Sequence, residues 1–216
     1  MKRIVSYALM IGLLSFFIGG CATTSTFSSE AKQSSGNIVI STDSFLGTKT
    51  AEYKERRFDA VFVSDLSCSL GFEPYFIMDG NENLASINLK IKVYTYGKTA
   101  DARFERIIFL SDKGRITIQL DPLSQSPKFI YKNQLLGNQY ETRCDVRISK
   151  DEYLKLHDFI VNSSSIRCAV YTTSNKVSEL REDGSSAHQV FNEVYNYYEE
   201  NLMNMEIIPT EKAIIQ

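Results

Sequence analysis

The sequence predicts an α+β fold: a mainly antiparallel sheet or partial sandwich of roughly eight to ten strands, with two amphipathic helices in its C-terminal half. Two observations predict it. Short apolar runs, some with period-two alternation, recur over residues 37–132, and turn residues separate them. Two later segments space their apolar residues three and four apart, as amphipathic helices do. We therefore expect one α+β domain over residues 37–205.

The first half of this domain carries strand signals. Residues 86–96 alternate most clearly, which predicts a half-buried strand with one wet face. Tyr94 and Tyr96 fall on that wet face and are the candidate partner-binding aromatics. Residues 107–110 and 116–120 flank a turn at Gly114 and predict a hairpin. An earlier run over residues 71–78 contains Pro74, which indicates an edge strand or a bulge.

The second half combines strands with helices. Residues 139–148 alternate without interruption, so Cys144 should face the core. Ser149 and Glu152 then form a capping-box pattern, which predicts a helix to about residue 161 that buries His157 among apolar neighbours. A second capping-box candidate, Ser186 with Gln189, begins a helix to about residue 203. Residues 206–216 form a short C-terminal tail.

The N-terminus has the pattern of an export signal. Lys2 and Arg3 precede a mostly apolar run over residues 4–18, shorter than the ~20 residues that a membrane-spanning helix needs. Residues 1–20 are therefore predicted to be a cleaved signal peptide. Behind it, residues 22–36 include eight serines and threonines, so residues 21–36 are interpreted as Cys21 followed by a flexible tether.

Residues 18–21, Ile-Gly-Gly-Cys, resemble the lipobox of bacterial lipoproteins. The resemblance covers only this segment and implies cleavage before Cys21 and acylation of its thiol. Acyl chains on Cys21 would hold the domain on a membrane. Ala22, in place of the aspartate that favours retention at the inner membrane, implies a cell-envelope location on the outer membrane facing the periplasm in a Gram-negative host. The alternative is an ordinary secretory signal with an incidental cysteine.

Charge and cysteine content narrow the function classes. Removal of the signal leaves 22 basic and 26 acidic residues, a net charge of −4, so nucleic acid is not an expected partner. Three cysteines besides Cys21 allow at most one intramolecular disulfide, and three pairings are open. Cys144 with Cys168 is the favoured pair if their strands are neighbours. Buried free thiols are the alternative.

Catalytic and metal-binding motifs are absent from the sequence. No Gly-x-Ser-x-Gly, phosphate-binding loop or His-Glu-x-x-His pattern occurs, and no cofactor or metal is expected. Residues 79–83 begin like a calcium loop, but Leu84 and Lys90 occupy positions that require Gly and Glu, so a hairpin turn is favoured. His188 would lie in the first turn of the last helix, where the helix dipole would lower its pKa and make it a candidate base.

These observations favour a membrane-anchored envelope lipoprotein of non-catalytic binding or scaffolding type. Its partner would be another envelope protein or a peptide, held by an exposed sheet edge or aromatic patch. Two alternatives stay open: an envelope hydrolase that uses His188, and a carrier of small apolar ligands. The carrier would require an enclosed apolar cavity of several hundred Å³.

Replacement of the lipidated cysteine tests the anchor. Cys21→Ser should release or mislocalise a domain that still folds, because the variant has no thiol to acylate. Fractionation of envelopes measures the location, and circular dichroism of the released protein measures the fold. A variant that stays in the membrane fraction as the parent does would contradict the prediction.

Overall fold

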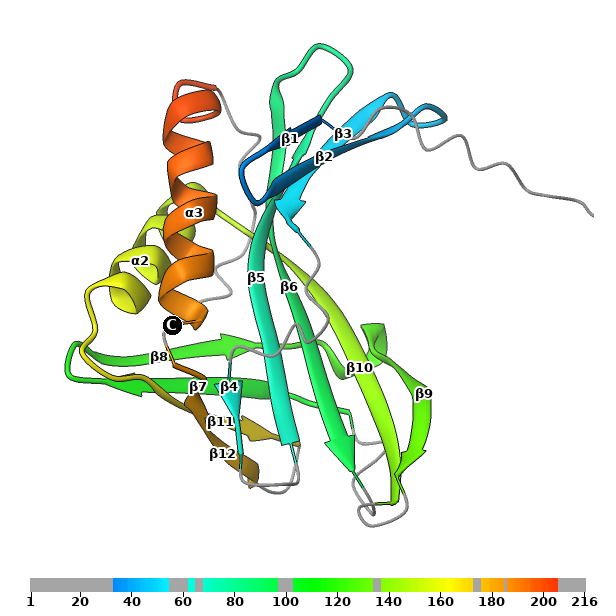
Figure 1. Cartoon of the computed structure of the whole chain (residues 1–216), viewed down its shortest axis with the longest axis vertical. Helices are drawn as coiled ribbons and strands as arrows, with labels where there is room; N and C mark the ends of the chain where they lie inside the picture. The colour runs from blue at the N-terminus through cyan, green and yellow to red at the C-terminus, as the bar shows by residue number, and fades with distance from the viewer. Residues whose placement is uncertain are drawn as a thin grey trace, which may run out of the picture. The chain divides into compact units, whose positions relative to one another are not determined.

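The protein contains a twelve-stranded antiparallel sheet with two helices in its C-terminal half (Figure 1). The computed structural model describes residues 33–54, 62–64, 68–96, 103–133, 137–172, 176–184 and 186–205. Within them the strands are β1 (Gln33–Ser35), β2 (Ile38–Asp43), β3 (Thr48–Tyr53), β4 (Phe62–Val63), β5 (Cys68–Met78), β6 (Leu84–Tyr96), β7 (Arg106–Ser111), β8 (Gly114–Gln119), β9 (Ser126–Asn133), β10 (Gly137–Ile148), β11 (Arg167–Tyr171) and β12 (Lys176–Glu182). The α-helices are α2 (Lys150–Val161) and α3 (Ser186–Asn201), and a 3-10 turn, η2 (Pro122–Ser124), follows β8. The predicted fold class is therefore confirmed.

Strand β5 is the branch point of the sheet. One of its edges pairs with β6 along its whole length, and β6 continues through β10 to β9. Its other edge pairs first with β4 and then with β3. The β4 branch continues through β12, β11 and β7 to β8, and the β3 branch continues through β2 to β1. Two groups of strands therefore diverge from one edge of a single long strand.

Pro74 lies where β5 changes partner. The Cys68 carbonyl accepts a hydrogen bond from Ser64 on the β4 side, and backbone polar groups alternate in direction along a strand. The Pro74 nitrogen therefore faces the same side, between Leu70, the last residue paired with β4, and Tyr75, the first paired with β3. A residue without an N–H loses no ladder hydrogen bond there. Pro74 thus marks the division of the sheet.

Three elements were not expected from the sequence. Strand β1 falls inside the segment interpreted as a tether, and β3 and β9 carry no clean apolar alternation. The prediction of eight to ten strands was therefore too low. Both neighbours of β11 are antiparallel to it, so α2 does not form the parallel crossover that the sequence left open.

The core consists of aromatic rings projecting from β5. The ring centroid of Phe72 lies 5.0 Å from that of Phe109 on β7 and 5.5 Å from that of Phe191 on α3. Phe76 contacts Tyr153 of α2 at 5.6 Å and Tyr198 of α3 at 5.5 Å. Because β7 is four strands from β5 along the sheet, the Phe72–Phe109 contact requires the sheet to curl over its own core.

The two helices begin in different ways. The predicted capping box of α2 is confirmed: the Ser149 hydroxyl accepts from the Glu152 N–H, and the Glu152 carboxylate accepts from the Ser149 N–H. In α3 the predicted box is wrong. The Glu182 carboxylate, at the end of β12, accepts from the N–H groups of Ala187 and His188 instead. A residue four positions upstream therefore supplies the cap predicted for Ser186.

The α2 cap gives a stability prediction. Ser149→Ala should lower the free energy of unfolding by about 1 kcal/mol, because the Glu152 N–H loses its acceptor. Chemical denaturation measures the change. Ser165→Ala is the matched control, since Ser165 is exposed outside any helix, and it should change stability by less than about 0.5 kcal/mol. Equal effects of the two substitutions would contradict the capping role.

Candidate functional site

Strand β9 is an edge strand that exposes apolar side chains. It pairs with β10 on one side, and on its other side no strand pairs with it within the described ranges. The register shifts between Gln139 and Tyr140, so β9 contains one extra residue, Ile130, opposite that step. Phe129 is 50% exposed and Ile130 is 40% exposed. The bulge thus leaves two consecutive apolar side chains in solvent.

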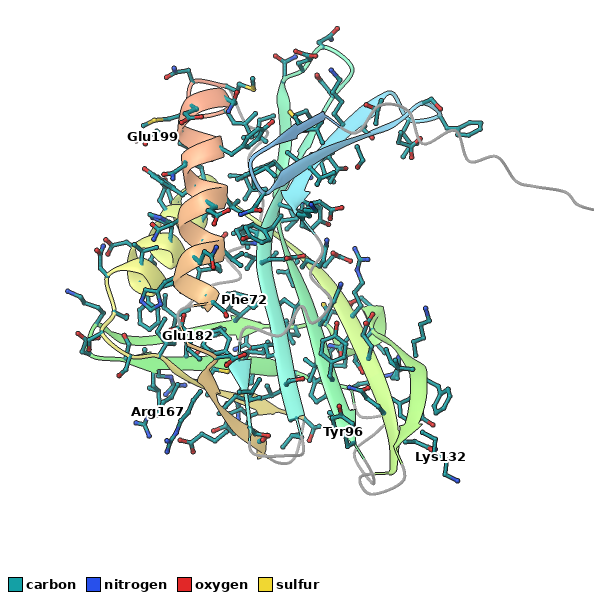
Figure 2. The ribbon with its side chains drawn as sticks, in the orientation of Figure 1. Phe72, Tyr96, Lys132, Arg167, Glu182 and Glu199 are labelled. Carbon is teal, nitrogen blue, oxygen red and sulfur yellow. The ribbon has the colours of Figure 1, made fainter. Side chains whose placement is uncertain are left out.

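Lysines flank this apolar pair on both sides. Lys128 and Lys132 are exposed, and Lys132 projects from the outer edge of the sheet (Figure 2). The Phe129 ring makes an edge contact with Tyr140 of β10, with 5.7 Å between centroids. No acidic residue occurs between positions 122 and 140, although the chain as a whole is acidic. We call Lys128, Phe129, Ile130, Lys132 and Tyr140 the β9 patch.

The face of β6 predicted to be wet is mostly covered. Lys90 is 9% exposed and Lys92 is 7% exposed, so the expectation of one solvated face was wrong. The ammonium of Lys90 pairs with Glu52 of β3 and lies 3.1 Å from Glu73 of β5. Burial opposes its charge, but these two carboxylates outweigh burial and raise the pKa of Lys90. Ion pairs with the neighbouring strands therefore shield this face of β6 from solvent.

Tyr94 and Tyr96 are less available than the sequence indicated. Both are half-buried on β6, and the Tyr96 hydroxyl accepts a hydrogen bond from the Gln139 side chain at 2.7 Å. The more exposed aromatic ring is Phe129, two strands away. The sequence pattern did not predict it, because β9 begins Ser-Pro and lacks alternation. The signal that could have found it is the Lys-Phe-Ile-Tyr-Lys run, apolar residues between two lysines.

His188 lies in the first turn of α3, as predicted, but both ring nitrogens are engaged. Nδ1 lies 2.8 Å from a Glu182 carboxylate oxygen, and Nε2 lies 2.9 Å from the Ser163 carbonyl oxygen. Both partners are acceptors, so the arrangement fits a protonated ring that donates through both nitrogens. Such a ring has no lone pair with which to act as a base. The geometry therefore gives His188 a structural role and does not support the hydrolase alternative.

The pKa of His188 moves opposite to the dipole-based expectation. Burial opposes its charge, but the hydrogen bonds to Glu182 and the Ser163 carbonyl, with the charge of Glu182, outweigh burial and raise the pKa. The dipole-based expectation did not include Glu182, which lies on a different element. His157 behaves in the reverse sense. It stacks on Tyr195 with 3.9 Å between centroids, and burial lowers its pKa.

The cysteines within the described ranges are buried free thiols. Cys68, Cys144 and Cys168 are each at most 5% exposed. Cys144 lies on β10, which pairs with β6 and β9, and Cys168 lies on β11, which pairs with β12 and β7. The disulfide between them was predicted on the condition that their strands are neighbours. These two strands are not neighbours. Burial raises the pKa of Cys68 to about 12 and raises that of Cys168. Protonated buried thiols are poor nucleophiles.

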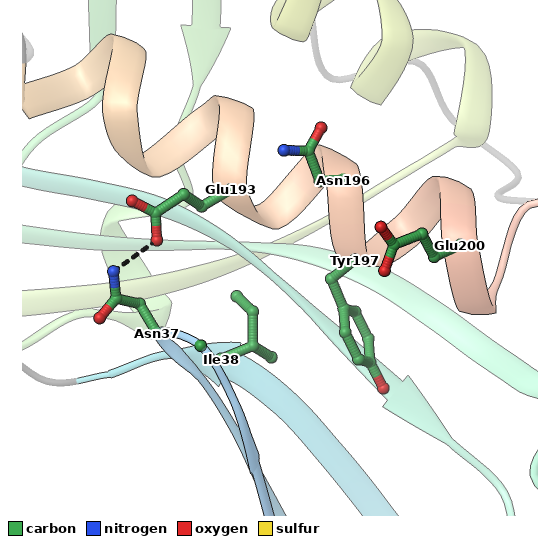
Figure 3. Close-up of a pocket in the computed structure, with 7 residues that line it drawn as sticks. Asn37, Ile38, Glu193, Asn196, Tyr197 and Glu200 are labelled. Carbon is green, nitrogen blue, oxygen red and sulfur yellow. Dashed lines mark hydrogen bonds between the residues drawn. The ribbon is translucent and has the colours of Figure 1, made fainter.

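A small, open pocket with a mixed polar and apolar lining lies between α3 and the β1–β2 turn (Figure 3). Its volume is about 160 Å³. The Asn37 amide donates to Glu193 at 2.6 Å across one side of it, and Glu200 and Asn196 add further polar groups. An apolar-ligand carrier would need an enclosed cavity of several hundred Å³. This pocket does not match that requirement.

Cys21, the predicted signal peptide and most of the predicted tether lie outside the described residues, as does the predicted C-terminal tail. Within the described ranges no helix is long and apolar enough to cross a membrane, and no group of three or more His, Cys, Asp or Glu side chains could hold a metal ion. Comparison with family models, curated proteins and solved structures finds no match for this chain.

The His188 contacts predict a pH dependence of stability. Because its pKa is raised on folding, the stabilisation is complete below about pH 6.5 and is lost as pH rises through the higher folded-state value. His188→Gln should therefore cost about 1 kcal/mol of unfolding free energy near pH 5.5 and less near pH 8. Urea denaturation of parent and variant across this range measures the difference.

His157→Gln is the matched control for this experiment. The lowered pKa of His157 means that its contribution is present above about pH 6.5 and is lost as pH falls. The difference between parent and His157→Gln should therefore grow with pH, while that for His188→Gln shrinks. Parallel slopes for the two variants would contradict the assignment of His188 as a protonated link between Glu182 and Ser163.

Proposed function

We propose that this protein is a lipid-anchored envelope protein without catalytic activity, and that its β9 patch binds an acidic, extended segment of another envelope protein. The observation that carries the proposal is the adjacent exposure of Phe129 and Ile130 on an edge strand between two exposed lysines. Apolar side chains left in solvent on an edge strand are a hazard unless a partner covers them.

Charge complementarity favours an acidic partner. In a mature chain of net charge −4, the β9 patch contributes Lys132, opposite Asn138, and Lys128, which lies opposite Glu141 of β10. A carboxylate-bearing segment would be steered chiefly toward Lys132, on the face of Phe129, while its apolar side chains cover Phe129 and Ile130. The edge of β9 that pairs with no strand in the described part of the chain also offers backbone groups to an extended chain, as in β-strand addition. Pro127 at one end limits how far such pairing extends.

The same residues disfavour pairing with a second copy. In an antiparallel β9–β9 pair centred on Ile130, Lys128 of each copy would lie opposite Lys132 of the other. Like charges directly opposite each other across a ladder are destabilising. Lysines and a bulge on an edge strand also block non-specific edge-to-edge association. A different chain, with acidic residues, therefore fits this edge better than its own copy.

The anchor supports a role at the membrane. The Ile-Gly-Gly-Cys pattern at residues 18–21 resembles a lipobox, and Ala22 accords with an outer-membrane location facing the periplasm. A domain held on a lipid by a short tether meets neighbouring envelope proteins at high effective concentration. A modest patch of two apolar side chains and two lysines is then sufficient for recognition. We therefore expect binding of moderate affinity.

Photo-crosslinking tests the patch. A photoreactive phenylalanine analogue at position 129, activated in intact envelopes, should capture a segment whose sequence, mapped by mass spectrometry, is acidic and extended. A synthetic peptide that alternates glutamate and valine serves as the purified probe. Lys128→Glu with Lys132→Glu should weaken its binding at least about tenfold, and added salt should weaken binding to the parent.

Matched controls come from a different part of the sheet. Leu110 on β7 is 41% exposed, and Lys113 lies in the exposed β7–β8 turn. The photoreactive analogue at Leu110 and the Lys113→Glu variant therefore repeat the label and the charge reversal at positions outside the β9 patch. Neither should capture the segment or change peptide binding. Capture of a basic segment, capture of a second copy, or unchanged binding by the double charge reversal would each overturn the proposal.

A further inference from the structure

The tip of the β2–β3 hairpin exposes two large apolar side chains. Phe45 is 94% exposed and Leu46 is 74% exposed, the highest values among the large apolar residues apart from Leu123. Neither contributes to the core, and both lie between the ends of β2 and β3, at a turn that projects from the sheet (Figure 1). Two adjacent, highly exposed apolar side chains make this tip a candidate contact with an apolar surface.

The tip is held in a defined conformation. The Asp43 carboxylate accepts from the N–H groups of Phe45 at 2.9 Å and Leu46 at 3.1 Å. Gly47 supplies the left-handed backbone, with φ of 63°, that closes the turn. Behind the tip, Lys49 forms an ion pair with Glu82 of the β5–β6 turn. The two apolar side chains are therefore presented by an ordered turn.

The register of β1 shows which end of the hairpin the preceding chain approaches. Gln33 pairs with Ile40 and Ser35 pairs with Ile38, so β1 begins beside the middle of β2, five residues before Phe45, and runs away from the tip. Eleven residues, 22–32, separate Gln33 from Cys21. A chain of this length spans at most roughly 40 Å. A lipid on Cys21 would therefore keep the β2–β3 hairpin within reach of the membrane surface.

We propose that Phe45 and Leu46 insert into the lipid bilayer, and that the hairpin tip is a second, non-covalent membrane contact of this protein. The inference rests on the proposed lipidation of Cys21, because a lipid there would keep the domain beside a membrane. Two contacts orient a domain, whereas a single flexible tether leaves its orientation free. The hairpin tip thus gives the anchored domain a preferred face toward the bilayer.

The charges around the tip indicate that it would contact the acyl chains of the bilayer and not its anionic headgroups. Lys49 is neutralised by Glu82, Asp43 caps the turn, and Asp79 belongs to the adjacent β5–β6 turn. These residues offer no unpaired cation to anionic headgroups, so attraction to an anionic surface cannot drive the contact. Insertion should instead depend on apolar burial. It should occur on zwitterionic lipid and be insensitive to salt.

A single tryptophan provides a direct test, because the chain contains none. The full-length Phe45→Trp protein is purified with its lipid and reconstituted into phosphatidylcholine vesicles, with and without a brominated acyl chain. The expected result is blue-shifted emission and at least about a twofold loss of intensity on brominated lipid, unchanged by added salt. Phe129→Trp is the matched control, an exposed aromatic position distant in sequence, and should not be quenched.

The same samples separate the two proposals. Intact mass and flotation report the acyl group and the attachment to vesicles, while quenching reports insertion of the tip. Attachment of Phe45→Trp without quenching, repeated with Leu46→Trp, would overturn tip insertion and leave the anchor in place. A chain without an acyl mass that does not float would overturn both. Circular dichroism establishes that each variant folds.

Discussion

Strand β5 makes the contacts on which the rest of the structure depends. Its inward rings, Phe72 and Phe76, contact β7, α2 and α3, so one strand joins both helices to the far part of the sheet. Aromatic pairs at these separations add stabilisation beyond simple area burial. The same strand divides its outer edge between β4 and β3 at Pro74. Packing on one face and the division at one edge together determine how the sheet curls.

The opposite face of the central strands is stabilised by charge. Lys90 lies between β3 and β5 carboxylates, and Arg143 of β10 forms a two-pronged pair with Asp145. Buried charges are tolerated only when they are paired, because desolvation of a lone ion is costly. The long side chains cover the strand between them. This face is therefore covered at β6, whereas on β10 Arg143 and Asp145 stay exposed to solvent.

The two surfaces proposed to act lie at opposite ends of the β5–β6 hairpin. The β2–β3 tip adjoins the Met78–Leu84 end, while Tyr140 of the β9 patch pairs with Thr95 near the other end of β6. The eleven residues of β5 between these ends correspond to roughly 35 Å. A domain that contacts the bilayer through Phe45 and Leu46 would thus present Phe129 and Ile130 away from the membrane. Anchoring and partner binding would not compete for the same surface.

Local patterns determined much of this protein by themselves. The alternation of β6 and β10, the Gly114 hairpin and the Ser149 cap follow from side-chain periodicity and short-range hydrogen bonding, which depend on neighbouring residues in the chain. Tertiary structure decided the rest. The burial of Lys90, the protonated state favoured for His188 and the exposure of Phe129 depend on Glu52, Glu182 and the β10 register. Those partners come from other elements, and a sequence does not state which strands will be neighbours.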